Sequence, residues 1–106
     1  MPKDRQLLEG KIALITGGGR GIGKSVALAF AREGADIVIT ARTDAQLNVV
    51  AEEIRSLGRS CVAIAADISV DKDVELVFKD AFDEFGRVDI LVNNAGIAID
   101  GPFVEI

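Results

Sequence analysis

The chain has 106 residues, a length that suits one domain or a part of a larger one. Apolar residues make up 49% of it and charged residues 27%, which is typical of a globular protein and argues against a disordered one. The formal net charge of -5 argues against nucleic acid or an anionic membrane surface as the main partner. A local basic site for a small anion is compatible with this charge.

The chain contains one cysteine and no histidine. This excludes an intramolecular disulfide, and a metal site built from His or Cys has no ligand set. Cys61 lies in the apolar run CVAIAA, where we interpret it as a small buried hydrophobic residue. The polar N-terminal segment lacks the apolar core of a secretory signal, and no apolar run approaches the about 20 residues that span a bilayer. We therefore expect a cytoplasmic protein.

Short apolar runs alternate with segments of helical periodicity along the chain. The runs are almost continuously apolar, as in strands that are covered on both faces of a parallel sheet. In chain order, the predicted elements are a strand at Ile12–Thr16, a helix at about Ile22–Glu33, a strand at Ile37–Thr40, a helix from about Asp44 to a stop at Gly58, a strand at Cys61–Ala66, a helix at about Asp71–Phe85 and a strand at Val88–Asn93.

Two of the predicted helices carry further signals. The first is apolar on most of its sides, so we expect it to be well buried. The second is preceded by Thr43, with Gln46 three residues later. This is a capping-box pattern, in which each of the two side chains would bond to the backbone N–H of the other residue.

The order of the elements predicts an α/β fold with a doubly wound parallel sheet in three layers. We expect four strands in the order 3-2-1-4, with the first two helices on one face of the sheet and the third on the other. A ligand crevice should lie between the first and the fourth strand, where the strand order reverses. The fourth strand would be an exposed sheet edge that is apolar on both faces.

The turn between the first strand and the first helix is rich in glycine and reads TGGGRGIG at positions 16–23. Glycines let a phosphate approach the backbone closely, and the N-terminus of the following helix favours an anion. We interpret this turn as a cradle for pyrophosphate; the alternative is a tight turn without a ligand. Gly18, Gly23, Lys24 and Ser25 also satisfy the P-loop pattern GxxxxGK[ST]. A P-loop nucleotide hydrolase, with Lys24 on phosphate and Ser25 on magnesium, is therefore an alternative function.

The turn at positions 16–23, followed by NNAG at positions 93–96, resembles the short-chain dehydrogenase/reductase family. That family carries TGxxxGxG after its first strand and NNAG after its fourth. The resemblance covers the chain from about residue 8 to residue 106 and implies a partial Rossmann-type fold. It further implies that residues 1–106 are the N-terminal portion of one dinucleotide-binding domain, truncated after the fourth strand.

The resemblance also implies cofactor-binding roles for individual residues. Those that match the pyrophosphate turn are Gly17, Gly19, Arg20, Gly21, Ile22 and Gly23. Asp67 matches a carboxylate that accepts a hydrogen bond from the adenine amino group, with Ile68 against the ring; the alternative role for Asp67 is helix capping. Those that match positions beside the nicotinamide ribose are Asn94, Ala95 and Gly96. Asn93 is similar to a position that braces the sheet through backbone hydrogen bonds.

The end of the second predicted strand indicates which nicotinamide cofactor the turn would hold. An acid there would bond the ribose 2′-hydroxyl and repel a 2′-phosphate. The sequence has Arg42 instead, whose planar guanidinium suits a phosphate, and Arg20 resembles a second basic position of NADP-using relatives. We interpret Asp44, the rival acid, as part of a helix start. We therefore predict NADP in preference to NAD; the alternative for both arginines is solvated surface charge.

The family's proton donor belongs to a Tyr-x-x-x-Lys pair downstream of NNAG, but this chain contains no tyrosine. We therefore predict no catalytic residue, no metal and no activity for this chain alone. The predicted function is the NADP(H)-binding portion of a short-chain oxidoreductase, which transfers a hydride between the nicotinamide and a carbonyl or alcohol substrate. The expected partners are the dinucleotide and that substrate, neither nucleic acid nor a membrane, and a homo-oligomer in the full-length parent. A non-catalytic dinucleotide-binding module is a further alternative.

Overall fold

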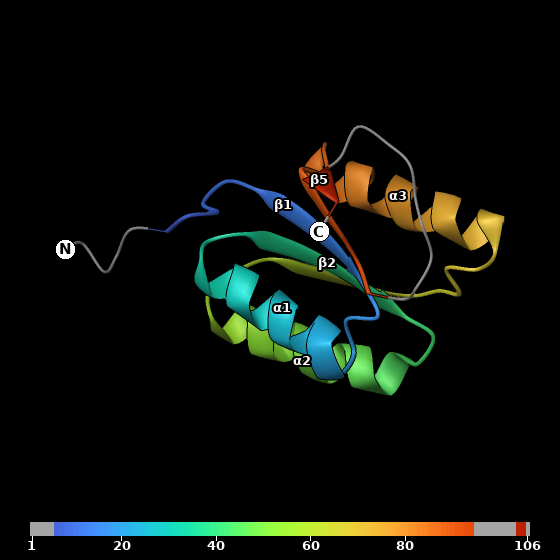
Figure 1. Cartoon of the computed structure of the whole chain (residues 1–106), viewed down its shortest axis with the longest axis horizontal. Helices are drawn as coiled ribbons and strands as arrows, with labels where there is room; N and C mark the ends of the chain where they lie inside the picture. The colour runs from blue at the N-terminus through green and yellow to red at the C-terminus, as the bar shows by residue number, and fades with distance from the viewer. Residues whose placement is uncertain (1–5, 95–103, 106) are drawn as a thin grey trace.

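The computed structural model describes residues 6–94 and 104–105 of the chain. Its elements in chain order are β1 (Ile12–Thr16), α1 (Gly21–Arg32), β2 (Asp36–Ala41), α2 (Asp44–Ser56), β3 (Cys61–Ala65), α3 (Asp71–Phe85), β4 (Ile90–Asn93) and β5 (Val104–Glu105). The strands form one sheet, in which every neighbouring pair is parallel and the order is β3-β2-β1-β4-β5 (Figure 1).

The predicted fold class and the strand order 3-2-1-4 are confirmed, and α3 has the predicted bounds. Strand β1 also has the predicted bounds. The other predicted elements differ from the prediction by one or two residues at one or both ends; β4, for example, begins at Ile90 rather than at Val88. The exposed edge that we expected along the fourth strand is wrong for Ile90 and Leu91, which pair with β5. The sequence does not predict β5, because a strand of two residues is too short to show the period of two by which strands are recognised.

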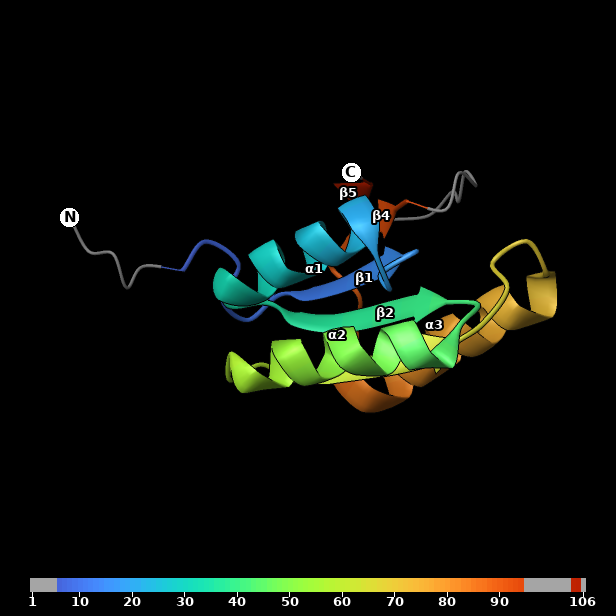
Figure 2. The same ribbon diagram turned by 90° about the horizontal axis from the view of Figure 1, so that it is seen from below.

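The sheet forms the middle layer of the described structure. Helices α1 and α2 lie on one side of it and α3 on the other (Figure 1), and the view from below shows α1 and α2 side by side (Figure 2). Ile15 and Ile39 belong to the core beneath α1 and α2, whereas Leu14 and Val38 pack with Val77 of α3. Both faces of the sheet are therefore buried, which explains why the strands are apolar along nearly their whole length.

Helix α1 is less buried than its apolar sequence predicts. Its buried residues are Gly23, Ala27 and Ala31, whose spacing of four places them on one side of the helix. Val26 is half-buried and Ala29 is exposed. The described elements that pack on α1 are β1, β2 and α2, and they cover one side of it only. The expectation of a helix buried on most sides is therefore wrong for the part of the chain that the structure describes.

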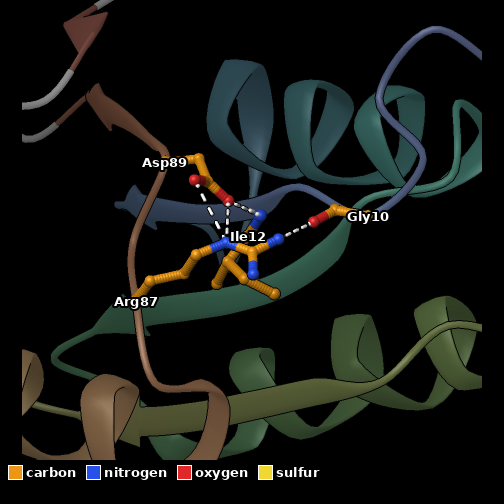
Figure 3. A network of polar contacts seen from close by, with 4 residues as sticks. All are labelled: Gly10, Ile12, Arg87 and Asp89. Carbon is orange, nitrogen blue, oxygen red and sulfur yellow. Dashed lines mark hydrogen bonds and ion pairs between the residues drawn. The ribbon is translucent and has the colours of Figure 1, made fainter.

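A polar network around Asp89 closes the amino-terminal edge of the sheet (Figure 3). The Asp89 carboxylate accepts the Ile12 N–H at 2.8 Å and pairs with Arg87 Nε at 2.9 Å, and the Arg87 guanidinium also donates to the Gly10 carbonyl. Burial alone would raise the pKa of Asp89, but the hydrogen bonds from Ile12 and Arg87 hold that pKa below its ordinary value. The network ties the residues before β4 to the start of β1.

Candidate functional site

A cleft of about 620 Å³ opens at the carboxyl-terminal edge of the sheet, between the segments that follow β1, β2, β3 and β4. The strand order reverses between β1 and β4, and doubly wound sheets bind ligands at this point. The predicted site residues that line the cleft are Gly17, Gly19, Arg20, Gly21, Ile22, Arg42, Asp67, Ile68 and Asn94. The structure therefore brings together residues from both predicted motifs.

The glycine-rich turn leaves the end of β1 and starts α1. Gly17 has a φ of 70°, a left-handed conformation that favours glycine. The N–H groups of Gly17 and Gly18 donate to the Thr40 carbonyl at 2.7 and 3.2 Å, which ties the turn to β2. The N–H groups of Gly21, Ile22 and Gly23, the first three residues of α1, have no acceptor within the helix, whereas the Lys24 N–H donates to the Arg20 carbonyl at 3.3 Å. Because Gly21 and Ile22 line the cleft, these donors and the positive end of the helix dipole are available to an anion there.

Gly23 and Asn94 explain physically why the two motifs occur together. A β-carbon at Gly23 would lie 2.0 Å from the Gly17 carbonyl oxygen and 2.9 Å from Asn94 Nδ2, which is closer than atoms can approach. A β-carbon at Gly17 would lie 3.2 Å from the same Asn94 nitrogen. The Asn94 amide therefore occupies the space that both glycines leave open. Gly23 does not line the cleft, whereas Gly21 and Ile22 do.

Thr16 joins the ends of β1 and β4. Its hydroxyl accepts the Asn94 N–H at 2.9 Å and lies 3.2 Å from Asn93 Oδ1 and 3.4 Å from the Val92 carbonyl oxygen, within donating distance of either. The contact of Asn93 with Thr16 is thus made by its side chain, in addition to the pairing of the two residues in the sheet. Ala95 and Gly96, the other predicted residues of the second motif, lie outside the described residues.

Arg20 and Arg42 line the cleft and are both exposed. Strand β2 ends at Ala41, so Arg42 follows it directly and no acid stands at its carboxyl end. An acid at that end is the group that would bond a ribose 2′-hydroxyl. Among the described residues, the lining of the cleft therefore combines two guanidinium groups with a single carboxylate, that of Asp67.

Hydrogen bonds hold the Asp67 carboxylate in a local turn. Its Oδ1 accepts the Ser69 hydroxyl at 2.6 Å and the Ser69 N–H at 3.0 Å. The hydrogen bond from the Ser69 hydroxyl lowers the pKa of Asp67 most, followed by the bond from the Ser69 N–H, and the charge of Arg42 lowers it less. The carboxylate is therefore ionised at neutral pH. Helix α3 has Val70 at its N-cap position, three residues after Asp67. The alternative in which Asp67 caps a helix is therefore wrong.

Helix α2 begins without the predicted capping box. Thr43 occupies the N-cap position but makes no side-chain cap hydrogen bond. Thr43 and Gln46 line the cleft instead. Gln46 lies against the glycine-rich turn, since a β-carbon at Gly19 would be 3.1 Å from Gln46 Cβ. The prediction is wrong because it considered only the local pattern, whereas the packing of the turn on α2 engages Gln46.

Thr40 and Ser69 also line the cleft, and the sequence does not single them out as site residues. Thr40 is 1% exposed, and its hydroxyl has no hydrogen-bond partner among the described residues. A signal for such residues exists in the topology, because polar residues at the carboxyl ends of parallel strands meet at one edge. Hydrophobic periodicity alone cannot tell a threonine of the site from a threonine of a strand.

Lys24 does not face the cleft as a P-loop lysine would. Its Nζ pairs with Glu53 Oε1 of α2 at 3.2 Å, and neither Lys24 nor Ser25 lines the cleft. This arrangement disfavours the alternative of a P-loop hydrolase, in which Lys24 binds phosphate and Ser25 binds magnesium.

Cys61 is free and 7% exposed, and its burial raises the pKa of the thiol to about 11. It is the small buried residue that we predicted. Within residues 6–94 and 104–105, no group of His, Cys, Asp and Glu side chains is arranged to hold a metal ion. No helix in that part of the chain is both long and apolar enough to cross a bilayer.

Comparison with known proteins shows which family the sequence of this chain resembles. The family model described as short chain dehydrogenase matches residues 11–106. An uncharacterized oxidoreductase of Mycobacterium tuberculosis is 47% identical over 89 residues, which cover 84% of this chain and 34% of that protein. An 11-beta-hydroxysteroid dehydrogenase-like protein, 4A of Arabidopsis thaliana, is 43% identical over 104 residues, 97% of this chain and 34% of that protein.

Solved structures show the same likeness. The 3-ketoacyl-(acyl-carrier-protein) reductase from Brucella melitensis, in a complex with NADH, is 48% identical and superposes with a TM-score of 0.75. The likeness covers 80% of this chain and 34% of that chain. The chain thus spans about a third of the length of these relatives.

Proposed function

Because the chain belongs to the short-chain dehydrogenase family, we propose that its cleft binds NADP(H) and that the chain is the N-terminal, cofactor-binding portion of an oxidoreductase. The whole enzyme would transfer a hydride, which the bound nicotinamide supplies or accepts, to or from a carbonyl or alcohol substrate. The observation that carries the proposal is the cleft itself. It joins the glycine-rich turn, two arginines and Asn94 at the point where the strand order reverses.

The pyrophosphate is assigned to the turn between β1 and α1. The donors at the start of α1 suit an anion, and Gly19, Gly21 and Ile22 line the cleft beside them. Gly17 and Gly23 act indirectly, since their missing β-carbons leave room for Asn94 and for the tight turn. In this proposal the backbone binds the pyrophosphate and the glycines make the backbone accessible.

The two ends of the dinucleotide are assigned to opposite sides of the turn. Asp67 is ionised and can accept a hydrogen bond from the adenine amino group, with Ile68 beside the ring. Asn94, held against the turn by Thr16, would lie beside the nicotinamide ribose together with Ala95 and Gly96. The Thr40 hydroxyl is buried and has no hydrogen-bond partner in the described part of the chain, which also suits a site that a polar ligand completes.

Preference for NADP rests on charge at the end of β2. A ribose 2′-phosphate would meet Arg42 directly after the strand and Arg20 in the turn, with no acid at the strand end. The reductase of Brucella melitensis was solved with NADH, so a relative of this chain binds the cofactor that lacks the 2′-phosphate. The preference of this chain must therefore come from its own residues after β2. In this chain those residues favour a phosphate.

Substitution of Arg42 tests the preference. Arg42→Asp should lower the NADPH-to-NADH affinity ratio by about tenfold or more, because a charge-assisted bond is replaced by repulsion. Titration of the wild type and the variant with both dinucleotides, followed by fluorescence or calorimetry, measures the ratio. Arg32→Asp is the matched control, since it makes the same change of charge at an exposed position outside the cleft. A ratio that is equal in wild type and Arg42→Asp would refute the assignment of Arg42.

The chain contains no tyrosine, so the Tyr-x-x-x-Lys pair expected of the family has no counterpart in it. We therefore propose that these 106 residues bind the cofactor without turning it over. The absorbance of NADPH at equimolar protein and excess carbonyl compound should stay constant. Steady oxidation that depends on the intact cleft, and is lost in Arg42→Asp, would contradict this part of the proposal.

Two alternatives predict different titrations. A P-loop hydrolase would bind ATP with magnesium and ignore NADPH, a result that would overturn the proposal. A non-catalytic module would bind the dinucleotide equally well, and the reading frame after codon 106 distinguishes it: a Tyr-x-x-x-Lys pair there supports the enzyme. A homo-oligomeric parent in the cytoplasm belongs to the same proposal, and the free thiol of Cys61 suits a reducing compartment.

A further inference from the structure

The loop that carries Asp67 suggests a further role for the first turn of α3. We propose that Asp73 is a positioning residue for recognition of the adenine base, a proposal that rests on the proposed function of the cleft. Its carboxylate holds the 67–70 loop (Asp67, Ile68, Ser69 and Val70) in the conformation that turns the Asp67 carboxylate towards the base.

Two sets of hydrogen bonds fix the 67–70 loop. Asp73 Oδ2 accepts the Asp67 N–H at 2.7 Å, and the Val70 N–H donates to the Asp67 carbonyl oxygen at 2.9 Å. The Ser69 hydroxyl and N–H bind Asp67 Oδ1 within the loop. The peptide of Asp67 is therefore held from α3, and its side chain is oriented from Ser69. Each hydrogen bond restricts the conformation of Asp67 before a ligand binds, so less conformational entropy is lost on binding.

The bond that Asp73 Oδ2 accepts connects the peptide of Asp67 to α3. Asp73 is half-buried and is itself fixed by the bond from its N–H to the Val70 carbonyl oxygen at 3.0 Å. The Asp67 N–H comes directly after the end of the sheet, where the Ala66 N–H still bonds to the Ala41 carbonyl oxygen at 2.9 Å. Without the Asp73 carboxylate, the Asp67 N–H would lose its acceptor, and this is the hydrogen bond that follows the end of the sheet and precedes the Asp67 side chain.

Asp71 provides a comparison within the same turn of α3. Both Asp71 and Asp73 lie in the first turn, where a negative charge is favourable to the helix dipole. Asp71 is exposed and accepts none of the hydrogen bonds that hold the 67–70 loop, whereas Asp73 is half-buried and accepts one. An effect of helix charge should therefore appear at both residues, and an effect of loop position at Asp73 alone.

The functional consequence is selectivity for the base. Adenine offers an amino group to the Asp67 carboxylate, whereas hypoxanthine offers a carbonyl oxygen at the same place. A carboxylate held in one orientation should prefer adenine, because an acceptor that faces another acceptor is left unpaired. A carboxylate released from its anchor can turn away from the carbonyl oxygen, so the preference should diminish.

The experiment measures the affinity of the full 106-residue chain for NADPH and for its hypoxanthine analogue by calorimetry. We expect the ratio of the two affinities to fall by about tenfold in Asp73→Ala, the effect of one charge-assisted hydrogen bond, and to stay at the wild-type value in Asp71→Ala. Asp73→Asn keeps a side-chain carbonyl that can accept the Asp67 N–H. It should give a ratio between those of wild type and Asp73→Ala, which a general loss of stability would not do.

A second measurement follows the bond itself. Amide hydrogen exchange at Asp67 should become about tenfold faster in Asp73→Ala and be unchanged in Asp71→Ala, because only the first variant removes the acceptor. This measurement needs no ligand, so it separates the position of the loop from the binding of the cofactor.

The outcomes distinguish this inference from the proposed function. An unchanged affinity ratio in Asp73→Ala overturns the role of Asp73, even where exchange at Asp67 is faster. Where Asp73→Ala does not fold, Asp73→Asn decides: a ratio below the wild-type value supports the role and a wild-type ratio overturns it. A wild type that binds neither dinucleotide, or binds both equally, overturns the proposed base recognition and the inference with it.

Discussion

The amino-terminal ends of the strands form one edge of the sheet and their carboxyl-terminal ends form the other, and these two edges use their polar groups in opposite ways. At the amino-terminal edge, Asp89 binds Ile12 and Arg87, and Arg87 binds Gly10, so that the groups satisfy one another within the chain (Figure 3). At the carboxyl-terminal edge, the start of α1 has donors without helical acceptors, and the hydroxyl of Thr40 is buried without a partner among the described residues. The comparison suggests that one edge maintains the fold and that the other remains incomplete until a ligand binds.

Gly23→Ala should break the carboxyl-terminal edge with the largest effect. The added β-carbon would collide with the Gly17 carbonyl oxygen, a backbone atom that cannot move without displacing the turn. We expect a loss of about 3 kcal/mol in the free energy of unfolding, as for severe overpacking, together with loss of NADPH binding. Urea unfolding followed by circular dichroism and calorimetry with NADPH measure the two effects.

Gly58→Ala is the control for this substitution. Gly58 has a φ of 86° and open space around it, so alanine there meets strain in the backbone but no collision. We expect a cost of about 1 kcal/mol and an unchanged affinity for NADPH, since the strain is local. Equal losses in the two variants would show that the collision with the Gly17 carbonyl oxygen is not what makes Gly23 necessary.

Asp89→Ala should break the amino-terminal edge without affecting the cleft. The Ile12 N–H and the Arg87 guanidinium would both lose an acceptor, and we expect a loss of about 2 kcal/mol in the free energy of unfolding. The affinity of the folded variant for NADPH should stay within about twofold of the wild type, because no residue of the network is among the described residues that line the cleft. A large loss of affinity would contradict the division of roles between the two edges.

The same two edges show what the sequence could predict. The strand order and the carboxyl-terminal site could be predicted from apolar runs and from two motifs. Glycines of the first motif stand where the backbone leaves no room for a β-carbon, so the sequence itself records this geometry. The network around Asp89 has no such pattern: Arg87 and Asp89 are near each other in sequence, but Gly10 and Ile12 are far away. The positions of Thr43 and Gln46 could not be predicted either, because the two residues fit a local capping pattern but line the cleft, where Gln46 lies against Gly19.

The pH dependence of stability gives the smallest effect and sharpens the assignment of Asp89. Its pKa is lower in the folded chain, so its stabilising contribution is fully present above its ordinary pKa and is lost as the pH falls through the folded value. At neutral pH, Asp89→Asn should be less stable than wild type by about 1 kcal/mol. The amide oxygen can still accept a hydrogen bond from the Ile12 N–H, but the neutral amide cannot form the ion pair with Arg87. The difference should begin to shrink as the pH falls below the ordinary carboxyl pKa, and the two proteins should converge as the pH passes through the lower pKa of the folded chain, where the carboxylate of the wild type becomes protonated. Urea unfolding at pH 6, 4.5 and 3 measures this difference, and a difference that stays constant would show that the charge of Asp89 does not contribute to the stability of the amino-terminal edge.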